Sequence, residues 1–253
     1  MNAEVRPQSI AAQLVVVPLL LVVWEGCVRV LGVSADKLPA PTVILEVIWE
    51  LRVSLAGAVG TTLLEAVIGL IAGTIFGILS GIVFSRSRII ERMFLPYFVG
   101  SQAVPILAFG AIIIMWFGNG IASKAVIAFY LSFFPVAVNT LSGMRSVGQD
   151  EIGLLRTFGA SSWTILFKLQ LPAALPAILT AVRLGASLAL IGAIVGEWFG
   201  ATQGLGAVLL TAMYEYRIDY LWAGIVLTGV TGVVMYGAVS FIQNRIAWWH
   251  AEA

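Results

Sequence analysis

Three ionisable side chains lie within long apolar runs of this sequence, where they could bind a polar solute or pair with another polar group. Glu65 and Glu197 are carboxylates, and Arg183 is a permanent cation. Ionisable groups are costly in apolar surroundings, so those that persist usually face a polar path or another polar group. Each carboxylate could line such a path, seal a gate or reach water at the end of its run. Arg183 lies about two turns into its run and can extend its guanidinium to the surface.

Two uncharged polar residues, Gln102 and Asn139, also lie in apolar runs. Pro105 follows Gln102 closely and should interrupt a helix there, because proline removes a backbone donor. Each polar side chain could face a path or hydrogen-bond a neighbouring helix. The single histidine, His250, and the single cysteine, Cys27, form neither a nucleophile–base pair nor a metal-ligand cluster. We therefore expect no catalytic site and no metal site.

The composition indicates a protein embedded in a lipid bilayer. Of 253 residues, 60% are hydrophobic and 11% charged, and the mean hydropathy is +1.01. Soluble domains carry about 25% charged residues. Lys and Arg (14) nearly balance Asp and Glu (13), so there is no basic excess to bind nucleic acid. The length fits one domain over 1–253.

Six apolar runs are long enough to cross a membrane as helices, which takes about 20 residues each. They are continuously apolar, whereas barrel strands alternate. The sequence therefore predicts an all-α bundle of six transmembrane helices. The expected spans are about 10–31, 57–84, 94–117, 122–144, 176–199 and 221–243.

Basic residues predict the orientation of this bundle, since Lys and Arg gather on the cytoplasmic side. With the N-terminus inside, the inner segments hold eight of them and the outer segments four. Both termini are therefore expected in the cytoplasm. The inner set is Arg6, Arg86, Arg88, Arg92, Arg145, Arg156, Lys168 and Arg245, and the outer set is Lys37, Arg52, Lys124 and Arg217.

Four glycines recur every fourth residue in the second run: Gly69, Gly73, Gly77 and Gly81. This spacing places them on one face of a helix. Small residues on one face let two membrane helices approach closely. The partner could be another helix of this chain or a second copy.

The longest inner segment, 145–175, should form two short helices broken at Gly159. Asp150 and Glu151 suit a helix start, and Ser161 or Ser162 can cap the second helix. An ordered segment of this length usually has a function. It could lie on lipid or dock an apolar face into a cytoplasmic partner.

This segment resembles the EAA loop of binding-protein-dependent ABC importer permeases. The family pattern is Glu-Ala-Ala, three residues, Gly, nine residues, an aliphatic residue, one residue and Leu-Pro. Gly159 and Leu171-Pro172 fit the spacing, whereas Gly153-Leu154-Leu155 occupy the triplet positions, so the triplet itself is missing. Glu151 could take the place of its glutamate.

Further matches follow in order along the chain. They resemble the branch of nitrate, sulfonate, taurine, pyrimidine-precursor and riboflavin permeases. The matching residues are Leu38-Pro39-Ala40-Pro41, Pro105, Ala108, Trp116-Phe117-Gly118, Gly120, Ser123-Lys124, Phe134-Pro135, Asn139-Thr140, Gly196-Glu197 and Gly204-Leu205-Gly206.

The resemblance implies a type I importer permease in a bacterial inner membrane. Its implied partners are a cytoplasmic ATPase dimer, an extracytoplasmic substrate-binding protein and a second permease copy, most simply identical. ATP and Mg would bind the ATPase, and none of the lysines (Lys37, Lys124, Lys168) lies in a P-loop pattern. The expected ATPase-coupling residues are Glu151, Gly153, Leu154, Leu155, Arg156, Phe158 and Gly159, and the expected path residues are Glu65, Gln102, Asn139 and Glu197.

The solute is predicted from charge and local similarity. No Lys or Arg falls at mid-membrane, so a small anion such as nitrate would find little to pair with. Ser101-Gln102, Leu64-Glu65 and Gly196-Glu197 look most like pyrimidine-precursor and riboflavin members. Sulfonate, taurine or nitrate transport is the alternative. A self-contained transporter or channel is less favoured, because the internal repeats that such folds carry are not evident.

Overall fold

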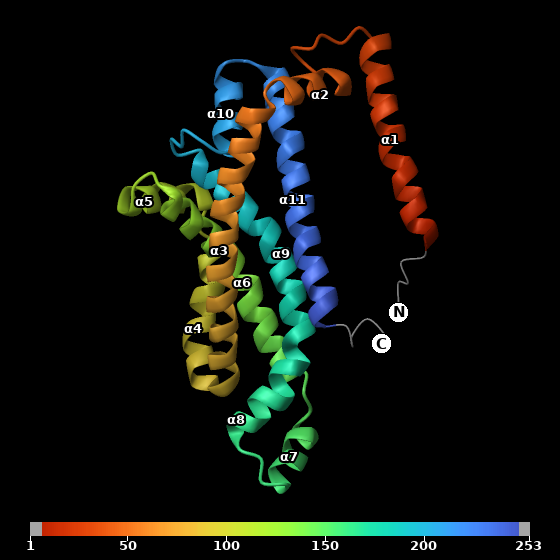
Figure 1. The fold of residues 1–253 in the computed structure, drawn as a ribbon. Helices are drawn as coiled ribbons and strands as arrows, with labels where there is room; N and C mark the ends of the chain where they lie inside the picture. The colour runs from red at the N-terminus through yellow and green to blue at the C-terminus, as the bar shows by residue number, and fades with distance from the viewer. Residues whose placement is uncertain (1–6, 248–253) are drawn as a thin grey trace.

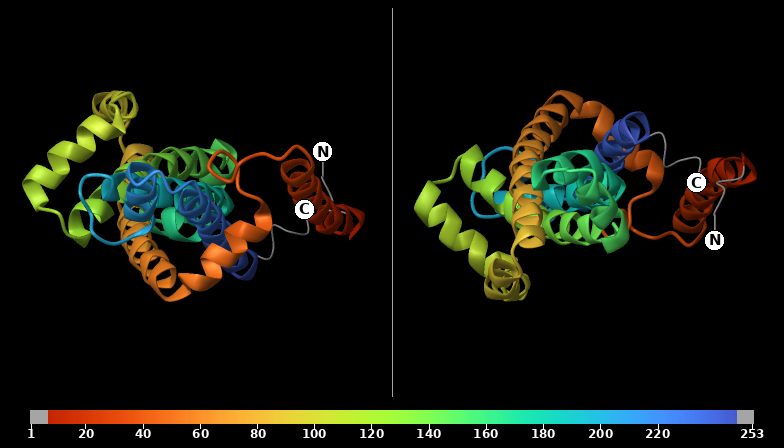
Figure 2. Two further views of the ribbon diagram at one scale, coloured as in Figure 1. Left: turned by 90° about the horizontal axis from the view of Figure 1, so that it is seen from above. Right: turned by 90° about the horizontal axis from the view of Figure 1, so that it is seen from below.

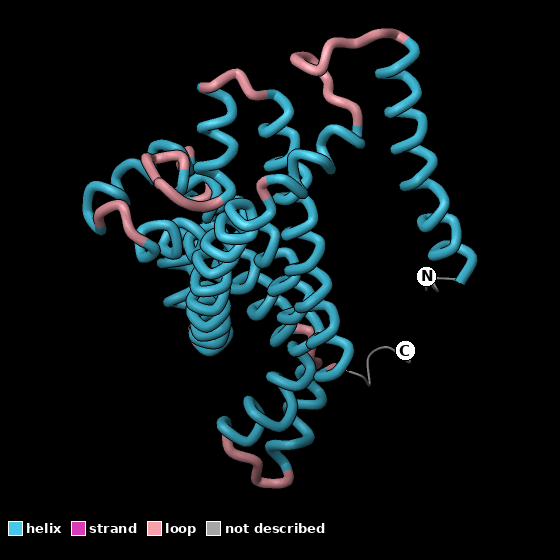
Figure 3. Tube along the Cα trace, turned by 45° about the horizontal axis from the view of Figure 1, so that its top comes forward, coloured by secondary structure: helices cyan, strands magenta, loops and turns pink. Residues whose placement is uncertain are grey.

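The computed structural model describes residues 7–247, with side chains from residue 15. Arg6 and His250 lie outside this range. Within it every regular element is a helix (Figure 3), which confirms the all-α prediction. The elements are α1 (Pro7–Val30), α2 (Pro41–Glu50), α3 (Arg52–Arg86), α4 (Arg88–Ser101), α5 (Ile106–Phe117), α6 (Ile121–Arg145), α7 (Gln149–Thr157), α8 (Ser162–Ile165), the π-helical turn η1 (Leu166–Gln170), α9 (Leu171–Glu197), α10 (Leu205–Tyr214) and α11 (Ile218–Ile246).

Three long helices, α3, α6 and α9, form the core of the bundle (Figure 1). Helix α11 lies against α9 and α10, and the short α2 contacts the first turns of α11. Figure 2 shows α1 standing apart on one side and the α4–α5 arm projecting on the other. Both peripheral elements expose large apolar side chains, as expected for surfaces that meet lipid or another subunit.

Four helices of the described chain are long and apolar enough to cross a membrane: α3, α6, α8–α9 taken together, and α11. Helix α1, with 24 residues, coincides with the expected first span. The expected third span, 94–117, is two helices, α4 and α5, bent by 99° at the break. Pro105 precedes α5 and lacks the N–H that would continue the helix.

The expected fifth span also differs at its start. A helical run of 36 residues extends from Ser162 to Glu197, through η1 and α9, so it begins well before residue 176. Pro172 lies in the first turn of α9, where proline is tolerated. The π-helical turn directly precedes it. The second half of the inner segment is therefore continuous with a membrane helix.

The four spaced glycines of α3 face α6 of the same chain. All four are buried. A Cβ added at Gly77 would lie 2.7 Å from the Phe133 carbonyl oxygen and 2.7 Å from Val136 Cβ. Helix α9 meets α6 in the same way, since a Cβ at Gly192 would lie 2.7 Å from Ala128 Cα. Glycines thus allow the backbones of the core to touch.

We predict that Gly77→Val lowers the free energy of unfolding in detergent by about 1–3 kcal/mol, because the added side chain overpacks the α3–α6 contact. Gly60→Val on the same helix is the matched control, since nothing lies within 4 Å of its added Cβ. Thermal unfolding of the two purified variants makes the comparison. Equal melting temperatures would contradict the close contact.

Candidate functional site

The end of the bundle far from α7, called the outer end below because the basic residues predict that it faces outside, holds a buried polar cluster around Glu197, the last residue of α9. Glu197 is fully buried. Its Oε1 accepts a hydrogen bond from Thr62 Oγ1 of α3 at 2.6 Å, and its Oε2 accepts one from the Gly206 N–H of α10 at 2.5 Å. Thr62 Oγ1 in turn accepts from the Leu205 N–H at 2.8 Å. The carboxylate therefore joins three helices at one point.

Two further ionisable residues are buried beside this carboxylate. Glu65, one turn after Thr62, is 3% exposed, and Lys124 of α6 is 2% exposed. Both interact electrostatically with Glu197 and with each other. Lys124 Nζ donates to Asn119 Oδ1, and Asn119 Nδ2 donates to the Gly200 carbonyl. Buried polar groups are tolerated best when each has a partner. The Glu197 oxygens and Lys124 Nζ have such partners, whereas the buried Glu65 Oε2 has none among the described residues.

The loop between α9 and α10 is shaped to reach the cluster. Gly204 has φ +109°, a conformation that side chains disfavour. A Cβ on Gly204 would also strike the Glu197 carboxyl group. Glycine at this position lets the loop fold over the carboxylate and present the Leu205 and Gly206 N–H groups. The Gly204-Leu205-Gly206 match noted in the sequence therefore has a geometric reason.

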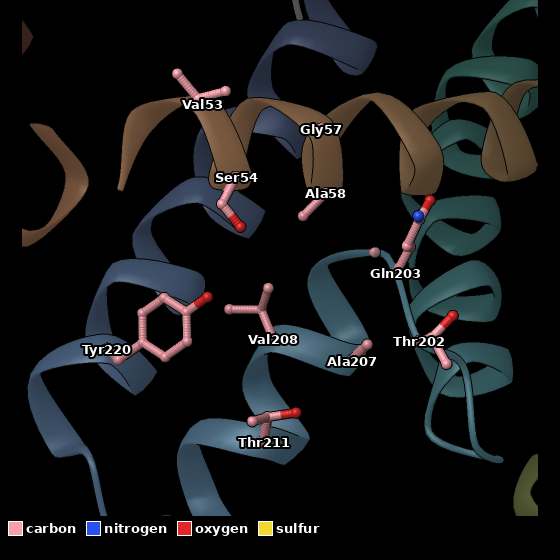
Figure 4. Close-up of a pocket in the computed structure, with 11 residues that line it drawn as sticks. Val53, Ser54, Gly57, Ala58, Thr202, Gln203, Ala207, Val208, Thr211 and Tyr220 are labelled. Atoms are coloured by element: carbon pink, nitrogen blue, oxygen red, sulfur yellow. The ribbon is translucent and has the colours of Figure 1, made fainter. Parts of the chain in front are cut away.

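A polar pocket of about 380 Å³ opens next to the cluster (Figure 4). Side chains from α3, the α9–α10 loop, α10 and α11 converge on it. Its hydrogen-bonding side chains are Ser54, Thr202, Gln203, Thr211 and Tyr220. Ala58 and Gly204 belong to both the pocket wall and the surroundings of the cluster. Neither Glu65 nor Glu197 is among the residues that line the pocket.

The other expected path residues lie elsewhere. Asn139 Nδ2 donates to the Pro135 carbonyl of its own helix at 2.8 Å. Gln102 ends α4 and is exposed. Arg183 Nη1 lies 3.3 Å from the Tyr236 hydroxyl of α11. The structure thus joins Glu65 to Glu197 and keeps Gln102 and Asn139 apart from them. Thr62 on α3 and Asn119 in the α5–α6 loop were missed, because neither a helix hydroxyl nor a loop amide reveals a distant partner in the sequence.

Residues 145–175 hold the expected ATPase-coupling residues and are called the coupling segment below. They form the opposite end of the molecule, where α7 and α8 extend below the bundle (Figure 1). Gly159 ends α7 with φ +77°. The Gly159 N–H bonds the Arg156 carbonyl and the Ala160 N–H bonds the Leu155 carbonyl, which is a Schellman C-cap. Ser161 Oγ then accepts from the Thr164 N–H at 3.1 Å and caps α8. Both features match the sequence prediction.

Side chains of α7 divide into a packed face and an exposed face. Ile152 is buried, and Leu155 packs against the small core of Val147, Ile152 and Ile165. Leu154 and Phe158 point to solvent, with 59% and 80% of their surface exposed. Glu151 Oε2 accepts from the Gly148 N–H at 3.2 Å, so this carboxylate caps α7.

The remaining expected coupling residues are open to the surroundings. Arg156 is exposed, and Gly153 is half-buried. Trp163 and Phe167 were not expected in this set, yet both are exposed and their rings stack at 5.9 Å. Their spacing of four residues on a helix was the available signal. They extend the exposed apolar surface of the segment onto α8 and η1.

We predict that Thr62→Val destabilises the protein by about 1–3 kcal/mol, because it leaves the buried Leu205 N–H and one Glu197 oxygen without a partner. Thr61→Val is the matched control, since the Thr61 hydroxyl bonds only the Gly57 carbonyl of its own helix, at 3.1 Å. Thermal unfolding in detergent measures both. The network is not stabilising if the two variants melt together.

Comparison with known proteins identifies the family. Residues 73–248 match the family described as binding-protein-dependent transport system inner membrane component. The formylaminopyrimidine transport permease ThiX of Halalkalibacterium halodurans is 33% identical over 235 residues, covering 92% of this chain and 94% of that protein. The taurine permease TauC of Escherichia coli is 30% identical, covering 92% and 88%.

A solved structure agrees on the fold. The inward-facing MetNI methionine ABC transporter matches with a TM-score of 0.67 at 19% identity, covering 78% of this chain and 96% of that one. Together with the apolar helices, these similarities place the chain in a membrane as a multi-pass protein. This chain belongs to the family of binding-protein-dependent ABC importer permeases, whose ATPase activity lies in a separate subunit.

Proposed function

We propose that this chain forms the solute path of an ATP-driven importer, and its family membership carries this proposal. Transport proceeds by alternating access: ATP binding and hydrolysis on a cytoplasmic ATPase dimer open the path first to one side and then to the other. ATP and Mg bind the ATPase, and this chain binds neither. Solute arrives on an extracytoplasmic binding protein.

The coupling segment is the proposed docking site for the ATPase. Leu154 and Phe158 expose apolar surface on α7, and α7 projects beyond the bundle (Figure 1). Exposed aromatic and aliphatic side chains on a short helix suit insertion into a groove. Arg156 and Glu151 add charge at the edge of this surface. Leu155 supports the segment from inside, because it packs against Ile152.

One helical run connects this docking site to the outer cluster. The 36 residues from Ser162 to Glu197 span about 54 Å at 1.5 Å per residue. Arg86 Nη2 of α3 donates to the Ser162 carbonyl at 2.6 Å, which fixes the start of the run to the core. Movement of α7 and α8 by the ATPase would therefore be carried to Glu197 and to the wall of the outer pocket.

A second permease copy completes the path in this proposal, and the simplest assembly is a homodimer. The α4–α5 arm projects to one side of the bundle (Figure 2), and α5 exposes Leu107, Ile112, Met115 and Trp116. Such an arm gains packing when another subunit covers it. In this proposal both termini lie in the cytoplasm of a bacterial cell, as expected from the distribution of basic residues, and the outer pocket lies outside.

The proposed solute is a small organic heterocycle, such as a pyrimidine precursor or a riboflavin-like compound. ThiX supports it by its overall similarity. The buried Lys124 also supports it, because this cation is already bound to Asn119 and faces two carboxylates, and so offers little to a free anion. Similarity to TauC keeps taurine or another sulfonate as the second candidate; nitrate follows it.

We predict that the double variant Leu154→Asp, Phe158→Asp weakens binding of the ATPase subunit about tenfold or more, since charged groups replace apolar anchors. Tyr216→Asp is the control, because Tyr216 is 87% exposed on the outer side, away from α7. Affinity is measured with detergent-purified protein that elutes as a single species. Unchanged affinity in the double variant would remove α7 from the docking site.

The solute is tested by reconstituting the permease with its ATPase in liposomes and adding the substrate-binding protein of the same transporter. We expect a pyrimidine or flavin ligand to bind that protein and to stimulate ATP hydrolysis and uptake. Nitrate, taurine and an aliphatic sulfonate serve as comparison ligands. Stimulation by any of these three alone would contradict the heterocycle assignment while leaving the importer assignment intact.

A further inference from the structure

A basic groove lies on α4, at the same end of the bundle as the coupling segment. It encloses about 820 Å³ and is lined by Arg88, Glu91, Arg92, Leu95, Pro96, Val99, Gly100 and Arg145. All but Arg145 come from one face of α4, because they recur at three- and four-residue intervals. Arg145 comes from the end of α6. Neither the outer cluster nor α7 contributes to this groove.

The charges in the groove are only partly compensated. The Arg145 guanidinium holds the Glu91 carboxylate in a two-point ion pair, with Nη1 to Oε1 at 2.8 Å. Arg88 and Arg92 are exposed and have no hydrogen-bond or ion-pair partner among the described residues. The start of α4, capped by Ser87, adds the positive end of a helix dipole. Two free guanidinium groups therefore face one side of the groove.

The lining changes from charged to apolar along the helix. Arg88 and Arg92 stand at the start of α4, and Leu95, Pro96 and Val99 follow toward its far end. From Arg88 to Gly100 the helix rises about 18 Å. A free anion would use only the basic end, and an acidic peptide would leave the apolar end uncovered. A molecule with an anionic head and a hydrocarbon tail matches both.

We propose that this groove binds an anionic phospholipid of the inner leaflet, with its phosphate on Arg88 and Arg92 and an acyl chain along Leu95 and Val99. Basic pockets on the cytoplasmic side of membrane helices commonly bind such headgroups. The lipid would lie beside the Glu91–Arg145 pair, which joins α4 to α6. This inference does not depend on the identity of the solute.

The test is native mass spectrometry of the full chain in detergent, titrated with phosphatidylglycerol or phosphatidylcholine carrying the same acyl chains. We expect phosphatidylglycerol to bind about 25-fold more tightly, because each arginine near an anionic headgroup contributes about fivefold. The double variant Arg88→Gln, Arg92→Gln should lose this preference. The matched control, Arg52→Gln with Arg217→Gln, removes two arginines from the outer end and should keep it.

A second variant tests the contact of the acyl chain with the apolar end of the groove. Val99→Asp keeps both arginines and should weaken binding of phosphatidylglycerol without changing the melting temperature of the lipid-free protein. The proposal is overturned if wild type binds the two lipids equally, or if the arginine double variant keeps the preference. It is also overturned if inorganic phosphate displaces the lipid, since the site would then recognise a simple anion. If the arginine double variant changes the oligomeric state but not lipid binding, the groove contacts a second copy of the chain, and the lipid proposal is wrong.

Discussion

Direct backbone contact among α3, α6 and α9 is the constraint on which the rest of the structure depends. Lipid tails are as apolar as the side chains, so the hydrophobic effect does not drive membrane helices together. Close packing of small residues supplies the attraction instead. Gly69, Gly73, Gly77 and Gly81 allow α6 to approach α3, and Gly192 allows it to approach α9. Larger residues there would separate the helices and pull Thr62 away from Glu197. The polar cluster is thus a product of the glycine contacts.

This packing also explains how buried ionisable side chains, which lose hydration, are accommodated in the bundle. Glu65, Lys124 and Glu197 come from three different helices and meet only because those helices touch. The Glu197 carboxylate receives hydrogen bonds from Thr62 and Gly206, which offset its loss of hydration. Its role is therefore to bind α3, α9 and α10 together beside the outer pocket. In the proposed transport cycle this junction is where motion of α9 reaches the pocket.

The sequence predicted features that depend on local chemistry and missed those that depend on distant partners. Apolar runs, the glycine spacing, the Gly159 stop and the Ser161 cap are local, and the helices follow them. The break at Pro105 was expected, but a proline does not specify a 99° bend. Leu155 was grouped with the docking residues, whereas its side chain packs inward, because a short helix pattern does not separate its two faces. Thr62 and Asn119 could be assigned to the cluster only from the structure, which shows the residues to which they hydrogen-bond.

One helical run, from Ser162 to Glu197, joins the coupling segment to the polar cluster beside the outer pocket. The direct measurement is the distance between spin labels at Val53 of α3 and Gln203 of the α9–α10 loop, which both line the pocket, in a Cys27→Ser background. The protein would be reconstituted with its ATPase subunit. We predict that adding ATP shifts this distance distribution, because movement of the coupling segment reaches the pocket through this run. An unchanged distribution while the bound ATPase hydrolyses ATP would contradict it.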